Sequence, residues 1–148
     1  MASQPETPTN PLIVILALDK ATFYNDLHTD FNKLLKRHAT VEYATTPAEA
    51  RAFFNRTTNK PSAILAADAS LTVSTCLTLV HDAAAYVRSG GTLVFMGLFP
   101  TFSLPSNLAP LFAQFGLPWR SGDYHRAGFG LNPGMAAHFE TGGLAGGV

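Results

Sequence analysis

The chain has 148 residues, of which 47% are hydrophobic and 14% charged, and its ten Lys and Arg residues balance its ten Asp and Glu residues. This length suits one domain with a real core, and the apolar composition excludes a disordered chain. The zero net charge provides no field that would attract nucleic acid or an anionic membrane, so neither partner is expected.

The single cysteine, Cys76, excludes an intramolecular disulfide framework and a multi-cysteine zinc site. Residues 1–11 are polar and contain three prolines, with no basic segment ahead of an apolar one. They are predicted to form a flexible N-terminal segment rather than a signal peptide. The longest uninterrupted apolar run, residues 12–18, is too short to span a bilayer. One thiol and no leader sequence favour a reducing, cytoplasmic setting.

The N-terminal half predicts two strands and two helices. Residues 12–18 are continuously apolar, which is typical of a central parallel strand, and the run ends at Asp19. The next segment predicts a helix that closes on basic side chains at 36–38. Its apolar stripe consists of Tyr24, Leu27, Phe31, Leu34 and Leu35. Residues 40–43 predict a short second strand nearer an edge, and a Thr-Pro-Ala-Glu capping box at 46–49 starts a second helix.

The following segment predicts a third strand, a third helix and a fourth strand. Residues 62–67 consist of Ser62 and five apolar residues, predict a strand, and again end at an acid, Asp68. The third helix is predicted to bury one apolar stripe and to stop at Gly90-Gly91, where glycine is the favoured C-cap. That stripe consists of Val73, Cys76, Leu77, Val80, Ala84 and Val87. Residues 92–96 form the fourth strand, which Gly97 closes.

Three strand–helix–strand crossovers in succession predict a parallel sheet with right-handed connections. The predicted fold class is therefore α/β: a flavodoxin-like, doubly wound, mainly parallel sheet of four to five strands in a three-layer sandwich. Beyond it, residues 98–103 predict an aromatic loop, residues 107–115 a helix, and residues 117–124 a last short strand. The predicted organisation is a single domain over residues 12–126, followed by a glycine-rich segment, residues 127–148, that is not expected to order by itself.

Open α/β sheets bind ligands outside the carboxyl ends of their strands. Here those ends carry Asp19, Asp68 and the segment from Gly97 to Phe99. Asp19, Asp68, Gly97 and Phe99 are therefore candidate ligand-binding residues. Two carboxylates at this edge suit a cation or a polar ligand. Aspartate is also a favoured N-cap and turn residue, and the sequence favours capping for both of them.

A second polar cluster follows the last predicted helix. Asp123-Tyr124-His125-Arg126 combines a general-acid candidate, a phenol and a guanidinium, which suits an anionic or sugar-like ligand. Asp123 and Arg126 are therefore further ligand-binding candidates, and His125 joins Asp68 and Asp19 as a catalytic candidate. The alternative, which the sequence favours, is a surface strand at the sheet edge.

Other signals of chemistry are weak. Cys76 lies on an apolar stripe, which predicts core packing rather than a nucleophile. His138 and Glu140 form a His-x-Glu pair that this composition produces by chance. No dinucleotide fingerprint or Walker-type loop follows a predicted strand, and the 18–22 turn lacks the glycines of a flavin-phosphate loop. No cofactor and no metal site are therefore expected.

The segment Pro61 to Asp68, followed by Tyr86 to Val94 with its V-R-x-G-G-x-L-V turn, resembles the class I glutamine amidotransferase-like superfamily, in particular its trehalose-utilisation-type branch. The resemblance covers about Leu12 to Trp119 and implies a flavodoxin-like fold. Catalytic members carry a nucleophilic cysteine on a tight elbow after the third strand, where this chain has Asp68-Ala69-Ser70. Glutaminase activity is therefore not expected. Members of the trehalose-utilisation branch lack that cysteine too.

The chain is also similar to response-regulator receiver domains, which place acids after their first and third strands, as Asp19 and Asp68 are placed here. It departs from them because Asp19 stands alone where receivers carry an acidic pair. Gly97 also replaces their hydroxyl residue after the fourth strand.

The expected function is that of a non-catalytic amidotransferase-like binding or interaction domain, with a small polar molecule as the ligand class. The alternatives are a small hydrolase-type enzyme that uses Asp68 and Asp19, and a degenerate receiver-like domain. Leu98, Phe99 and Phe102 would form an exposed apolar loop, which favours a homo-oligomer.

Overall fold

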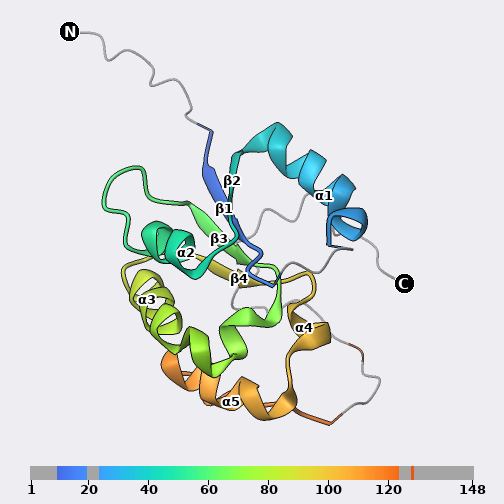
Figure 1. Ribbon diagram of the computed structural model, residues 1–148, viewed down its shortest axis with the longest axis vertical. Coiled ribbons are helices and arrows are strands. Elements are labelled where there is room, and N and C mark those ends of the chain that lie inside the picture. The colour runs from blue at the N-terminus through green and yellow to red at the C-terminus, as the bar shows by residue number, and fades with distance from the viewer. Residues whose placement is uncertain (1–9, 20–23, 124–127, 129–148) are drawn as a thin grey trace, which may run out of the picture.

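The computed structural model describes residues 10–19, 24–123 and 128 of the chain. Its centre is a four-stranded, all-parallel sheet with the strand order β2-β1-β3-β4 (Figure 1). The strands are β1 (Leu12–Leu16), β2 (Thr40–Ala44), β3 (Ala63–Ala66) and β4 (Leu93–Phe95). The predicted parallel sheet is confirmed. Its order reverses between β1 and β3, which is the switch point of a doubly wound fold.

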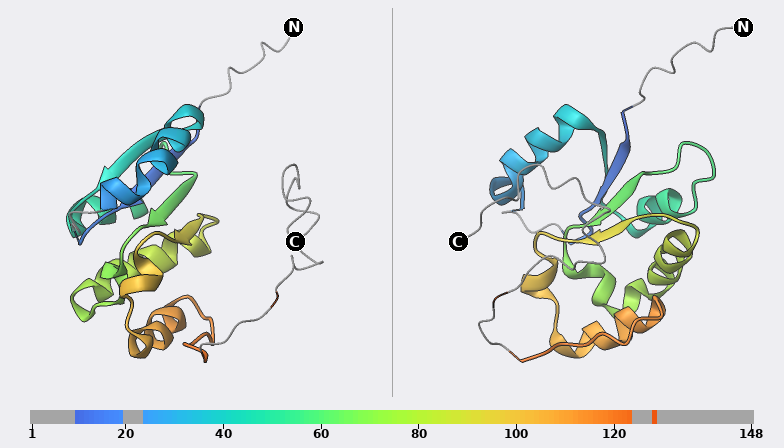
Figure 2. Two further views of the ribbon diagram at one scale, coloured as in Figure 1. Left: turned by 90° about the vertical axis from the view of Figure 1, so that its right-hand side faces the viewer. Right: turned by 180° about the vertical axis from the view of Figure 1, so that it is seen from behind.

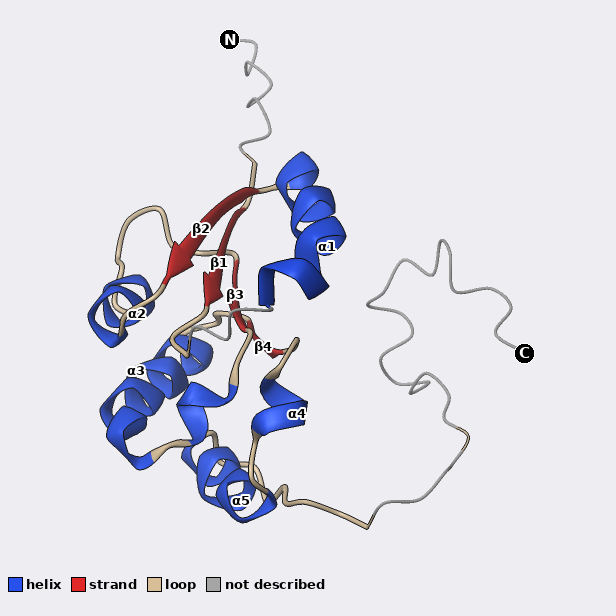
Figure 3. Ribbon diagram, turned by 45° about the vertical axis from the view of Figure 1, so that its right-hand side comes forward, coloured by secondary structure: helices blue, strands red, loops and turns tan. Residues whose placement is uncertain are grey.

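Helices cover both faces of this sheet, which gives the predicted three layers. One face carries α1, and α2 and α3 lie on the other, with α5 packed against α3 (Figures 2 and 3). The helices are α1 (Tyr24–His38), α2 (Pro47–Phe54), α3 (Leu77–Arg88), α4 (Phe99–Phe102) and α5 (Pro105–Gln114), and two 3-10 turns, η1 (Ala69–Thr72) and η2 (Ser74–Cys76), precede α3.

The first strand is central because it pairs with a strand on each side. Ile13 is in register with Val41 of β2 and with Ala63 of β3. The uninterrupted apolar run of β1 follows from this position, since both its faces are covered by helices. By contrast, β2 lies at an edge, where it leaves Tyr43 37% exposed, as the weaker sequence pattern predicted.

The two faces of the sheet are packed unequally. The larger core lies between the sheet and α2, α3 and α5, and the smaller one, around Ile15, Leu65 and Leu98, lies on the α1 face. The prediction that Phe31 and Leu34 are buried was wrong, since they are 39% and 54% exposed. Among the described residues no second helix lies beside α1 on this face, so these two side chains have no neighbouring helix to pack against.

The predicted stripe of the third helix is confirmed only in part, since Cys76, Val80 and Ala84 are buried as predicted. Val73 and Leu77 are 45% and 51% exposed, whereas the buried side chains of the helix are Leu79, Val80, Ala83, Ala84 and Tyr86. Val73 is exposed because it stands in an extended conformation between two 3-10 turns, η1 and η2, rather than in an α-helix, and Leu77 is the first residue of α3. A 3-10 turn has 3.0 residues instead of 3.6, so apolar residues before Leu77 do not continue the helical stripe behind it.

The second helix begins as predicted, with a capping box. The side chain of Thr46 accepts a hydrogen bond from the Glu49 amide at 3.3 Å, and the Glu49 carboxylate accepts from the amides of Thr45 and Thr46 at 2.8 and 3.1 Å. These hydrogen bonds, that from the Thr45 amide above all, lower the pKa of Glu49 from its ordinary value. Three backbone amides at the helix start, those of Thr45, Thr46 and Glu49, are thereby satisfied.

Two predictions for the C-terminal half were wrong. Residues 98–103 are not an exposed aromatic loop, because Phe99 starts the short helix α4 and both Leu98 and Phe99 are only 5% exposed. The Phe99 ring packs on Phe95 of β4 with a centroid distance of 4.5 Å, whereas the Phe102 side chain is exposed. Residues 117–123 form no strand, so the described sheet has four strands rather than five.

The Tyr86–Val94 motif is explained by a single packing arrangement. The hydroxyl of Tyr86 donates a hydrogen bond to the buried carbonyl of Pro61 at 3.0 Å, across the start of the third strand segment. The phenol ring lies over Gly91 so closely that a Cβ at this position would be 2.3 Å from Cζ of Tyr86. Position 91 therefore requires glycine, because the Tyr86 ring occupies the space of a side chain. Gly90, with φ of +93°, has a different role and ends the helix.

We expect Gly91→Ala to destabilise the domain by about 1–3 kcal/mol, because the added methyl group displaces the Tyr86 ring and its hydrogen bond. Urea denaturation measures this loss. Gly122→Ala is the matched control, since a Cβ there has no atom within 4 Å. Equal stability of the two variants would show that the ring does not depend on Gly91.

The stability of the domain should fall above about pH 10 in a manner that depends on Tyr86. Burial of the phenol raises its pKa above the ordinary 10.0, so the unfolded chain loses this proton at a lower pH than the folded one. The stability that the protonated Tyr86 contributes is fully present below pH 10.0, and it is lost as the pH rises through the pKa of Tyr86 in the folded state. Denaturation of wild type and Tyr86→Phe at about pH 9 and about pH 11 tests this. An unchanged pH slope in the variant would contradict it.

Candidate functional site

Asp68 is the central side chain at the carboxyl edge of the sheet. It directly follows β3 and is only 7% exposed. Its Oδ1 accepts a hydrogen bond from the Ser70 amide at 2.9 Å, and its Oδ2 accepts one from the Asp19 amide at 2.8 Å. The first bond caps η1 and the second ties the end of β1 to the end of β3. The predicted capping role of Asp68 is therefore confirmed.

A histidine that the sequence analysis did not single out lies at the same edge. Gly97, which follows β4 with φ of +63°, approaches α1 so closely that a Cβ there would be 3.2 Å from Nε2 of His28 and 3.0 Å from the Ala67 carbonyl oxygen. The helical spacing offers a signal for this residue, since His28 precedes Phe31 and Leu35 by about one and two turns and so shares their face. Gly97 lacks a side chain because His28 and a backbone carbonyl occupy that space.

The structure therefore brings some of the candidate residues together and not others. Asp19, Asp68 and Gly97 meet at the sheet edge, where Asp19 is exposed and its amide is bound to Asp68. Phe99 is part of the core and presents no surface to a ligand there. Asp123 is exposed near the end of the described chain, and His125 and Arg126 lie outside the described residues, as do His138 and Glu140.

The cysteine is placed as predicted. Cys76 is 8% exposed and belongs to the larger core, immediately before α3 rather than inside it. Within residues 10–19, 24–123 and 128, no group of three or more His, Cys, Asp or Glu side chains is arranged to hold a metal ion.

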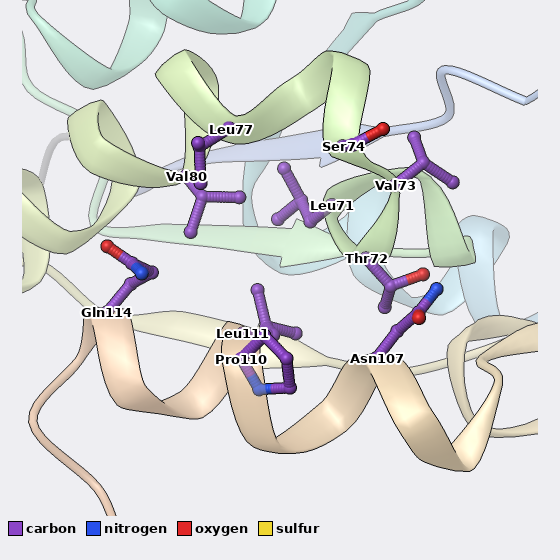
Figure 4. A pocket seen from close by; sticks show the side chains of 10 residues that line it. All are labelled: Leu71, Thr72, Val73, Ser74, Leu77, Val80, Asn107, Pro110, Leu111 and Gln114. Atoms are coloured by element: carbon purple, nitrogen blue, oxygen red, sulfur yellow. The ribbon is translucent and has the colours of Figure 1, made fainter.

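A hollow of about 440 Å³ lies next to this edge, between the 3-10 turns with α3 on one side and α5 on the other (Figure 4). We call it the α3–α5 groove. It adjoins the edge because η1 begins at Ala69, directly after Asp68. Its lining consists of Leu71, Thr72, Val73, Ser74, Leu77, Val80, Asn107, Pro110, Leu111 and Gln114. The volume lies within the usual range of small-molecule sites.

The groove has an apolar middle and polar ends. Leu71, Val80 and Leu111 line its centre, Thr72 and Asn107 face each other toward one end, and Gln114 stands at the other (Figure 4). The sequence does not reveal this site, because its pattern predicts one continuous helix through the 3-10 turns, with Val73 and Leu77 turned into the core. Both side chains form a lip of the groove: Val73 stands between the two 3-10 turns, and Leu77 begins α3 directly after them.

Comparisons of this chain with protein-family models, with curated proteins and with solved structures find no match. A search of the described residues also finds no helix that is both long and apolar enough to cross a membrane.

We expect Asp68→Asn to destabilise the domain by about 1–3 kcal/mol, because an amide can accept only one of the two backbone hydrogen bonds and turns a donor toward the other. Asp30→Asn is the control, since the Asp30 side chain is 98% exposed, and its effect should stay within about 0.5 kcal/mol. Thermal or urea denaturation compares them. A Asp68→Asn variant as stable as the control would contradict the capping role.

Proposed function

We propose that this chain is a non-catalytic, amidotransferase-like binding domain whose ligand is a small molecule. The observation that carries the proposal is the state of Asp68. At the position where catalytic amidotransferases hold their nucleophile, this carboxylate is 7% exposed and each of its oxygens accepts a backbone amide. A catalytic group has to present its reacting atom to a substrate, and this one is turned to the protein itself.

The resemblance in Pro61–Asp68 and Tyr86–Val94 supports the architecture and not a reaction. Tyr86 and Gly91 pack on each other, and the hydroxyl of Tyr86 binds the Pro61 carbonyl, so the residues of this motif hold the third strand segment to the end of α3. Because the residues of this motif serve packing, the motif fits a domain that has an amidotransferase-like scaffold without the amidotransferase reaction.

The hydrolase alternative depends on Asp68 and Asp19 as chemical groups. We expect wild type and Asp68→Asn to hydrolyse p-nitrophenyl acetate and p-nitrophenyl phosphate at the same background rate, because Asp68 acts as a cap. Both proteins are assayed at a temperature where denaturation curves show them folded. A wild-type activity that falls about 100-fold in Asp68→Asn, with the fold retained, would sink the non-catalytic proposal. A receiver-like domain would instead bind beryllofluoride at Asp68, and binding by wild type but not Asp68→Asn would favour that alternative.

Self-association loses its predicted basis. Of the residues Leu98, Phe99 and Phe102, only Phe102 is exposed, at 53%. The exposed apolar loop from which a homo-oligomer was predicted therefore does not exist in that form. The proposed function therefore concerns ligand binding by the domain itself.

A further inference from the structure

We infer that the α3–α5 groove binds an uncharged small molecule that has an apolar body and a hydroxyl or amide group at one end. This inference rests on the proposed binding function and names its site and ligand class. It is carried by the size of the groove, its lack of charge, and the position of its polar groups.

The charge of the ligand follows from the lining. None of the ten described residues that line the groove is ionisable, and their polar members carry only hydroxyl and carboxamide groups. The guanidinium of Arg88 donates to the Gln114 backbone carbonyl at 2.7 Å and is not part of the lining. An ionic headgroup inside the groove would lose its hydration without gaining a counter-ion, which is strongly unfavourable. A neutral molecule avoids that penalty.

The polar end of the groove offers both a donor and an acceptor. Thr72 Oγ1 donates to the Ala69 carbonyl at 2.7 Å, so its lone pairs remain available to accept. Asn107 Oδ1 accepts from Ser106 Oγ at 3.3 Å, and the Asn107 side-chain N–H groups donate no hydrogen bond within the described residues. Because Thr72 and Asn107 face each other across the groove (Figure 4), a ligand hydroxyl could donate to one and accept from the other.

The apolar body of the ligand would cover side chains that are now half in water. Val73 is 45% exposed and Leu77 51% exposed at the lip, above the buried Leu71 and Leu111. Covering such carbon surface is favourable at about 25 cal/mol per Å². The wall that carries the lip is fixed, since Asp68 caps η1 and holds it to the end of β1.

A matched ligand series tests the charge and the site together. The probes are 1-octanol, octanoate and octylammonium, which share one chain and differ in headgroup charge, and methyl NMR spectra of the full chain follow their binding. We expect 1-octanol to shift the methyl signals of Leu71, Val80 and Leu111, and to bind about tenfold more tightly than either ion. Equal or tighter binding of an ion, or shifts confined to Phe31 and Leu34 on α1, would overturn the inference.

Two variants test the residues. Leu77→Gln should weaken 1-octanol binding about threefold to tenfold, because it removes the apolar lip. Leu34→Gln is its matched control, since Leu34 is 54% exposed on the opposite face of the sheet, and it should leave the affinity unchanged. Asn107→Ala should weaken 1-octanol about fivefold by removing the polar end. Equal affinities of wild type, Leu77→Gln and Asn107→Ala would refute the site.

The failure of this inference is distinguishable from failure of the proposed function. If none of the three probes shifts a groove signal at millimolar concentration while calorimetry detects a sugar, nucleotide or metal ion, the groove assignment falls and the binding domain stands. Asp68-dependent hydrolysis would overturn the proposed function whatever the probes do.

Discussion

The paired hydrogen bonds of Asp68 are the constraint on which the rest of the functional edge depends. One carboxylate at the end of β3 accepts an amide from the end of β1 and an amide from the first 3-10 turn. It thereby sets where the chain goes after each of the two central strands. Because the carboxylate is buried, its two acceptors are held in fixed directions, and loss of either bond would leave a backbone donor unsatisfied near the core. Aspartate is a common catalytic residue, but Asp68 here holds the backbone in place.

That use of Asp68 shapes its surroundings. Capping at this position starts η1, and the two 3-10 turns carry the chain sideways before α3 begins at Leu77. Val73 and Leu77 therefore lie at the surface opposite α5. The groove lies between these two residues on one side and α5 on the other. The groove is thus a consequence of how the third strand ends. Its neutral lining separates it from the polar edge beside it, where Asp19 and His28 lie.

The sheet itself is supported unevenly, with a large core on the side of α2, α3 and α5 and a smaller one under α1. The described helix on the smaller side leaves Phe31 and Leu34 half exposed. The larger side is also closed by aromatic packing, in which Phe95 of β4 contacts Phe99, Phe112 and Phe115. These contacts explain why Phe99, which looks like part of a surface loop in the sequence, belongs instead to the core.

The sequence by itself determined the parallel sheet, the alternation of its four strands with three helices, the capping box at Thr46 and Glu49, and the capping role of Asp68. These features depend on local patterns, such as a continuous apolar run or a cap residue at a fixed offset, which are visible within a few positions of the chain. Only the tertiary structure decided the position of His28 beside Gly97, the burial of Phe99 and the existence of the groove. Each of these depends on where separate elements meet, and for the groove on a change from 3.6 to 3.0 residues per turn that residue spacing does not reveal.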